Sequence, residues 1–139
     1  MKDYSKEYIK ALGLYSAGIG IGSFVYLRRI IEFLIENAFK KAEKQGAMTQ
    51  EEHLKDGNRN RRVDEKIKIL KDYLPEFMVF NAVIYNIISK GIHELSEDEC
   101  IEIFPILQKS IKLILDEEIA IRQKEYDKSS TAGVREDKI

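Results

Sequence analysis

Residues 23–44 read SFVYLRRIIEFLIENAFKKAEK, and the spacing of the apolar residues in this segment is the main indication of the predicted fold. An α-helix turns by about 100° per residue, so side chains three or four positions apart share a face. One face of this stretch is apolar throughout, and it consists of Phe24, Leu27, Ile31, Leu34, Ile35, Ala38 and Ala42. We therefore expect a long helix from Ser23 to Lys44 that buries this face and ends at Gln45-Gly46.

The rest of the chain shows the same helical period. The further predicted helices are Tyr4–Tyr15, Asp64–Tyr73, Glu76–Lys90 and Ser96–Tyr126, with a short turn after the capping box Thr49–Glu52. The helix at 76–90 is the most apolar and is expected to be the most buried, and the last helix is expected to kink or restart at Pro105. No stretch alternates apolar and polar residues over the length of a strand. The predicted fold class is all-α, an antiparallel bundle of four to five helices.

A chain of 139 residues suggests one domain. We expect the bundle to occupy residues 1–126. From Asp127 to Ile139 the composition turns to Lys, Ser, Gly, Asp and Glu, which predicts a disordered C-terminal tail. Hydrophobic residues make up 44% of the chain and charged residues 34%, so the bulk of it is not intrinsically disordered.

Charge and cysteine content narrow the class of function. The 23 basic residues nearly balance the 24 acidic ones, so binding to nucleic acid through overall charge is not expected. A local basic patch remains, formed by Arg59, Arg61, Arg62, Lys66 and Lys68. The single Cys100 excludes an intramolecular disulfide, and two isolated histidines offer no metal-ligand spacing. Neither a secretory signal nor a membrane span is visible, so a cytoplasmic location is expected.

Arg28 lies inside the apolar face of the long helix, between Phe24 and Ile31. A guanidinium in such a place needs a partner, and Glu32, four residues further on, is the nearest candidate. Two interpretations stay open. The side chain can reach solvent from the edge of the face, or it can be a cation positioned in a cleft between helices.

A second polar group stands at the end of the apolar helix at 76–90. If that helix continues through Gly91, then Asn86, Ser89 and His93 share one polar stripe, with Lys90 beside them. Histidine is suited to proton transfer near neutral pH, although His93 can also simply end the helix. On the outer side of the long helix, a further apolar group predicts self-association; it consists of Val25, Tyr26 and Phe33.

Three stretches follow one another along the chain: YLRRIIE at 26–32, DEKIKIL at 64–70 and SKGIHELS at 89–96. Their order and spacing resemble the HEPN superfamily, and more narrowly the bacterial HEPN-like domains found in defence and abortive-infection loci. The similarity covers about residues 11–118. It implies an all-α bundle that dimerises, with a polar site near the dimer axis.

Catalytic HEPN proteins cleave RNA without metal through an R-x-x-x-x-H motif. Its histidine works on the ribose 2′-hydroxyl or the leaving oxygen, and its arginine stabilises the phosphorane charge. His93 matches that histidine, and Gly91 matches the small residue before it. No arginine stands at the expected place, which holds Asn86, Ile87 and Ile88. The resemblance therefore favours binding over cleavage.

The sequence leaves three functions open. We expect a HEPN-like dimeric module in a bacterial defence or stress context that binds RNA, nucleotide or a partner protein without catalysis. Its binding residues would be Arg28, Glu32, Asn86, Ser89 and Lys90. The alternatives are a metal-independent endoribonuclease with His93 as acid/base, and a structural dimerisation domain of a longer protein. None of the three calls for a metal or a cofactor.

Overall fold

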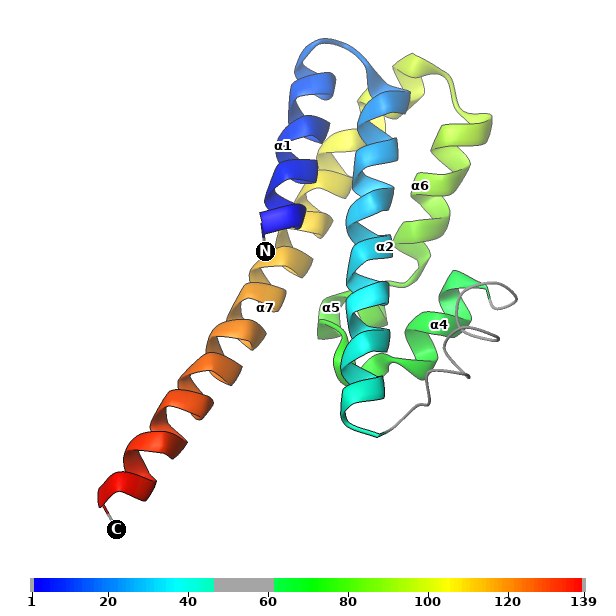
Figure 1. The fold of residues 1–139 in the computed structure, drawn as a ribbon. Helices are drawn as coiled ribbons and strands as arrows, with labels where there is room; N and C mark the ends of the chain where they lie inside the picture. The colour runs from blue at the N-terminus through cyan, green and yellow to red at the C-terminus, as the bar shows by residue number, and fades with distance from the viewer. Residues whose placement is uncertain (1, 47–61, 139) are drawn as a thin grey trace.

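The computed structural model describes residues 2–46 and 62–138, and within these ranges all regular structure is helical (Figure 1). The elements are α1 (Lys2–Ser16), α2 (Gly20–Lys44), α4 (Val63–Ile69), a 3₁₀ turn (Lys71–Tyr73), α5 (Glu76–Phe80), α6 (Val83–Glu94) and α7 (Glu97–Lys138). The all-α prediction is confirmed. The predicted capping box at 49–52, together with Arg59 and Arg61, lies outside the described residues.

Helix α2 is the centre of the bundle. Helices α1, α6 and α7 pack along it, while α4 and α5 lie beside its C-terminal half (Figure 1). All seven residues of the predicted apolar face are buried. Ile30 and Phe39 are buried as well, because α2 has neighbours on more than one side. No helix among the described residues is long and apolar enough to cross a membrane.

The prediction of one deeply buried helix at 76–90 is wrong. Asn81 and Ala82 form a turn that separates α5 from α6, and the Asn81 side chain donates to the Phe77 carbonyl at 2.9 Å. This bond takes up a carbonyl at the end of α5, as asparagine often does at helix ends. The break leaves Phe80 exposed, so α2 and not this segment is the most buried element. Helix α6 continues through Gly91, as the polar stripe requires.

Helix α7 is one continuous helix, without the restart that Pro105 predicts. Pro105 lies on the exposed side, where water can satisfy the carbonyl that lacks a donor. The backbone also stays helical over 127–138, where composition predicts a disordered tail. Beyond Glu118 no described side chain of α7 is buried, and Figure 1 shows the helix extending past the bundle. The last described side chain of α7 that is buried therefore lies before the composition changes at Asp127.

Carboxylates of α7 cap two other helices. Glu97 accepts from the amides of Gly20 at 2.6 Å and Ile21 at 3.3 Å, at the start of α2. Glu117 does the same for α5, accepting from Glu76 and, at 3.0 Å, from Phe77. A carboxylate at a helix N-terminus satisfies free amides and opposes the positive end of the helix dipole. These contacts fix the ends of α2 and α5 against α7.

The predicted capping box at the start of α7 is confirmed. The Glu99 amide donates to the Ser96 hydroxyl at 3.2 Å, and the Ser96 amide donates to the Glu99 carboxylate at 3.0 Å.

Two glycines allow close contact in the same region. A β-carbon on Gly20 would lie 2.7 Å from the Cys100 β-carbon, and one on Gly91 would lie 2.3 Å from the Phe24 ring. Glycine is therefore required where these helices meet.

Candidate functional site

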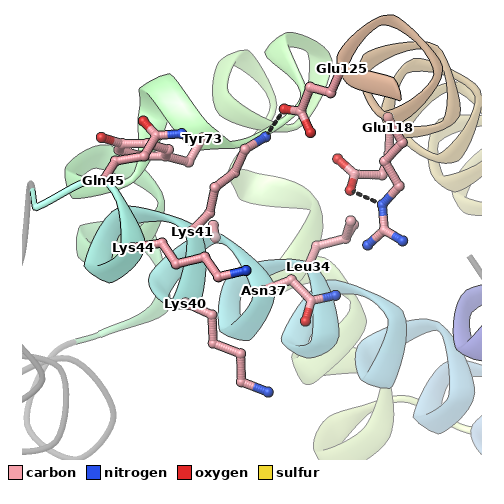
Figure 2. A pocket seen from close by; sticks show the side chains of 11 residues that line it. Leu34, Asn37, Lys40, Lys41, Lys44, Gln45, Tyr73, Glu118 and Glu125 are labelled. Atoms are coloured by element: carbon pink, nitrogen blue, oxygen red, sulfur yellow. Dashed lines mark hydrogen bonds and ion pairs between the residues drawn. The ribbon is translucent and has the colours of Figure 1, made fainter. Parts of the chain in front are cut away.

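A groove of about 750 Å³ lies between the C-terminal half of α2 and the middle of α7 (Figure 2). We call it the α2–α7 groove. Its lining comes from α2, α7 and the 3₁₀ turn, and consists of Leu34, Asn37, Ala38, Lys40, Lys41, Lys44, Gln45, Tyr73, Glu118, Arg122 and Glu125. No histidine, cysteine, serine or threonine stands among these lining residues. These lining residues therefore offer charge and hydrogen bonds, without the Ser, Thr or Cys nucleophile and the His base of triad-type catalysis.

The lining has an excess of positive charge. Four of its residues are basic and two are acidic, whereas the whole chain has a formal net charge of −1. Lys41 pairs with Glu125 across the groove. Lys40 and Lys44 are exposed and form no ion pair with another described residue. Two ammonium groups at the rim are thus available to an anion from solution.

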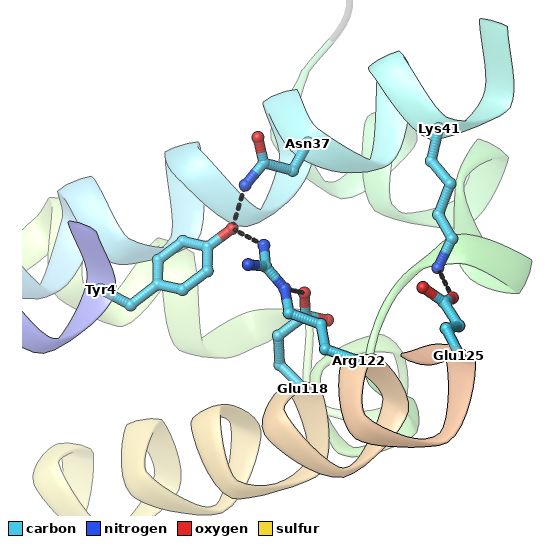
Figure 3. Close-up of polar contacts among 6 residues, drawn as sticks. All are labelled: Tyr4, Asn37, Lys41, Glu118, Arg122 and Glu125. Carbon is cyan, nitrogen blue, oxygen red and sulfur yellow. Dashed lines mark hydrogen bonds and ion pairs between the residues drawn. The ribbon is translucent and has the colours of Figure 1, made fainter. Parts of the chain in front are cut away.

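Arg122 is held in place by residues from three helices (Figure 3). Its Nε donates to Glu118 at 2.9 Å, and its Nη2 donates to the hydroxyl of Tyr4 at 3.4 Å. That hydroxyl also accepts a hydrogen bond from Asn37. The guanidinium lies 5.3 Å from the centre of the Tyr4 ring, within the range of a cation–π contact. This network connects α1, α2 and α7 beneath the groove.

The titration behaviour of the network favours fixed charge over proton transfer. Burial is the largest cause that raises the pKa of Tyr4, and the nearby Glu118 carboxylate also raises it. Hydrogen bonds from Asn37 and Arg122 act to lower this pKa, but the net shift is upward. Tyr4 is therefore neutral at pH 7. Burial is the largest single effect and acts to lower the pKa of Arg122, but the hydrogen bonds and charges of Glu118 and Tyr4 together outweigh it and the pKa is raised. The groove presents a permanent cation over a neutral phenol.

Part of the site predicted from the sequence does come together. Arg28 Nε lies 4.0 Å from Glu32 Oε2, and Tyr85 of α6 donates to the same Glu32 oxygen at 3.3 Å. Burial is the largest cause that raises the pKa of Tyr85, and the negative charge of Glu32 raises this pKa further. A hydrogen bond with Ser89 acts in the opposite direction. Tyr85 therefore connects three of the predicted residues. Arg28 Nε is buried and makes no hydrogen bond within the described residues.

This cluster borders a second groove, of about 420 Å³, between α2, α4 and α6. Its charged lining residues are Glu32, Glu36 and Lys66. With two carboxylates against one ammonium, the described part of its lining attracts a phosphate poorly. An arginine in a cleft between helices was one of two interpretations of Arg28. The structure places Arg28 beside Glu32 at the edge of this second groove, whose described lining carries more acidic than basic side chains.

The other predicted residues, Asn86, Lys90 and His93, do not join this cluster. They are exposed on the face of α6 opposite the buried Ile84 and Ile88, and none makes a hydrogen bond or ion pair with a described residue. The shared polar stripe is therefore present, but it faces solvent. His93 has no described group beside it that would orient its ring.

The remaining predicted patches have local explanations. Arg62 lies 3.6 Å from Asp64, and Lys68 is exposed. On the outer side of α2, Tyr26 lies beneath Lys10 and Arg29, with charged groups 5.4 and 5.1 Å from its ring centre. Phe33 packs on Tyr4 at a ring distance of 6.5 Å. Helix α1 thus covers part of the face that the sequence assigns to self-association.

Sequence reasoning missed the α2–α7 groove. A signal was present in Glu118 and Arg122, which continue the buried face of α7 that passes through Ile111 and Leu115. Charged residues on such a face need partners. Neither Tyr4 nor Asn37 could be identified as those partners, because they lie 118 and 85 positions away from Arg122.

Comparison with known proteins adds no assignment. No protein-family model matches the chain, no curated protein shows significant similarity to it, and no solved structure matches significantly. Within the described residues no three His, Cys, Asp or Glu side chains are grouped so as to hold a metal ion. The function of this chain must therefore be inferred from its own grooves and surfaces.

Proposed function

We propose that this chain is a non-catalytic helical module that binds a phosphate-bearing ligand, RNA or nucleotide, in the α2–α7 groove. The observation that supports it best is the positive excess of this groove in a chain with nearly balanced charge. An anion is attracted to a local basic surface even when the whole molecule is neutral.

The groove combines two kinds of cation. Arg122 is preorganised by Glu118 and Tyr4, so it needs little ordering when a ligand arrives. Lys40 and Lys44 are exposed ammonium groups that can follow a phosphate backbone or a polyphosphate. The aromatic ring of Tyr73 lines the same groove and offers a surface on which a base can stack.

The resemblance to the HEPN superfamily belongs to this proposal. It adds a bacterial defence or stress context and a dimeric state. A role without catalysis agrees with the solvent-facing position of His93 and with the missing arginine of the R-x-x-x-x-H motif. The alternative is a metal-independent endoribonuclease with His93 as acid/base, and the polar stripe of Asn86, Ser89 and His93 on α6 favours it. A structural dimerisation domain of a longer protein is the third reading, favoured by the extension of α7 past the bundle.

The test is fluorescence polarisation with a short labelled single-stranded RNA, and with ATP as competitor. The double variant Lys40→Gln/Lys44→Gln is expected to bind the RNA about tenfold more weakly and to lower the salt slope by about one per lost phosphate contact. The control double variant Lys6→Gln/Lys109→Gln removes the same charge from exposed sites outside the groove. It should bind like the wild type. Equal weakening by both pairs, or no binding by the wild type, contradicts the proposal.

A parallel incubation separates binding from cleavage. The wild type and His93→Ala are mixed with total RNA in EDTA, and the RNA is analysed on a denaturing gel. Intact RNA in both samples is expected for a binding module. Cleavage by the wild type that disappears in His93→Ala would establish the ribonuclease alternative instead.

A further inference from the structure

An exposed apolar face runs along α5, α6 and α7. Its five side chains are Phe80 (76% exposed), Val83 (58%), Ile87 (37%), Ile106 (70%) and Leu113 (52%). We call it the α5–α7 face. Exposed apolar residues are common on proteins when they are scattered singly, whereas several that lie together mark an interaction site.

Contacts at both ends show that the two halves of this face adjoin. At one end the Cys100 thiol of α7 donates to the Gly91 carbonyl of α6 at 3.4 Å. At the other end Glu117 of α7 binds the first amides of α5. The chain therefore runs from α5 to the end of α6 antiparallel to α7. Between these anchors, residues 80–87 lie alongside the segment of α7 that contains Ile106 and Leu113.

The orientation of α7 agrees with this. Gln108 and Arg122 reach the Tyr8 and Tyr4 hydroxyls of α1, so they mark the flank of α7 that faces α1. Glu117 marks the flank towards α5, and Leu113, four residues before it, shares its side of the helix. Ile106 is seven residues before Leu113 and continues that side. The apolar flank of α7 therefore lies next to α5 and α6.

The size of the face suits a second copy of this chain. Its five side chains expose roughly 500 Å² of apolar surface, in the upper part of the range for the largest patch on a monomer. Two copies meeting through it would bury roughly 1,000 Å² before any rim is counted, which is the size at which a specific interface becomes plausible. None of the five residues is charged, so the face does not repel its own copy.

We infer that the α5–α7 face is a symmetric dimer interface, in which Ile106 and Leu113 of one chain pack against α5, α6 and α7 of the other. A two-fold contact requires one surface to complement itself, and an uncharged apolar surface does so. The interface differs from the one predicted on Val25, Tyr26 and Phe33, which α1 partly covers. It also leaves the α2–α7 groove open, because Arg122 belongs to the opposite flank of α7.

The test is the mass of the full chain in solution, measured by light scattering and sedimentation over a range of concentrations. The wild type is expected at twice the chain mass of 16.1 kDa. Ile106→Glu on α7 and Val83→Glu on α6 should each raise the dissociation constant at least tenfold and give monomer. Because the two residues are exposed and lie on different helices, misfolding of one variant, as judged by circular dichroism, leaves the other to decide.

Ile9→Glu is the matched control, since Ile9 is 66% exposed on α1 and lies outside the face. It should remain dimeric, and Phe33→Glu should too. A monomeric wild type overturns the inference. So does dissociation by Ile9→Glu or Phe33→Glu with no effect of the two face variants. If a folded, monomeric Ile106→Glu variant still binds RNA, then the dimer interface and the RNA-binding groove are independent of each other.

Discussion

Replacing Gly91 by alanine places one methyl group at the most crowded contact of the bundle. A β-carbon at this position would lie 2.3 and 2.4 Å from two ring carbons of Phe24, and 3.5 Å from the Cys100 sulfur. Carbon atoms in contact prefer about 3.5–4.0 Å, so a shift of more than about 1 Å is needed. The Phe24 ring is fully buried, and Cys100 lies on another side of the added methyl. Neither helix can move away freely.

Two effects of opposite sign determine the magnitude. Alanine is more favourable than glycine inside a helix by about 1 kcal/mol. Overpacking of a closely packed core costs about 1–3 kcal/mol, and a contact this short belongs at the upper end. We expect a net loss of about 1–2 kcal/mol in the free energy of unfolding. With a typical denaturant slope, this loss lowers the urea midpoint by about 1 M.

The assay is urea denaturation followed by circular dichroism, with Gly13→Ala as the matched control. Gly13 lies within α1, and an added β-carbon there meets no atom within 4 Å. The same substitution should therefore stabilise the fold by about 0.5–1 kcal/mol through helix propensity. In a Phe24→Leu background the cost of Gly91→Ala should shrink, since the methyl gains room. A Gly91→Ala variant as stable as wild type would mean that the Phe24 ring moves aside at no cost, contrary to the expected loss.

Two further predictions concern the carboxylates near the start of α7. Glu97→Ala removes the acceptor for the Gly20 amide and should lower the free energy of unfolding by about 1 kcal/mol, as measured by thermal or urea unfolding. Glu97→Gln should lower this free energy by less. Equal stability of wild type and both variants would contradict the role of Glu97 as a cap. Hydrogen bonds from Ser96 lower the pKa of Glu99, so its charged form stabilises the fold above the ordinary glutamate pKa of about 4.3. This contribution is lost as the pH falls through the lowered folded-state pKa. The stability advantage of wild type over Glu99→Gln should therefore shrink between pH 7 and pH 3, and a constant difference would contradict it.

Much of the fold could be predicted from the sequence because burial follows helical periodicity. The apolar face of α2 and the capping box at Ser96 both depend on residues close together in the chain. The break at Asn81 could not be predicted in this way. An apolar run from Phe77 to Ile88 fits one helix as well as two, and α5 ends at the turn of Asn81 and Ala82, where the Asn81 amide and side chain both donate to the Phe77 carbonyl.

The candidate site depends on contacts that periodicity does not describe. Arg28 and Glu32 are four residues apart, so their pairing is visible in the sequence, while the Tyr85 hydroxyl that joins them comes from α6. His93 drew attention as a residue type. Its position on the solvent side of α6 depends on which face of that helix meets α2 and α7. Residue chemistry suggested candidates, and packing decided which of them lie near one another.

Helix α7 shows why such a site escapes a one-dimensional pattern. Its period separates a buried face from an exposed one, but two flanks of the helix have different neighbours. One flank presents Glu118, Arg122 and Glu125 to α1 and α2 and forms a groove of fixed charge. The other carries Ile106 and Leu113 beside α5 and α6 and remains uncovered. Hydrophobic spacing places Glu118 and Arg122 on the buried face and Ile106 and Leu113 on the exposed one, since it reports the distance of a residue from the core and not the element that it meets. The chemistry of each flank, a basic groove and an apolar face, becomes visible only when the neighbouring helices are in place.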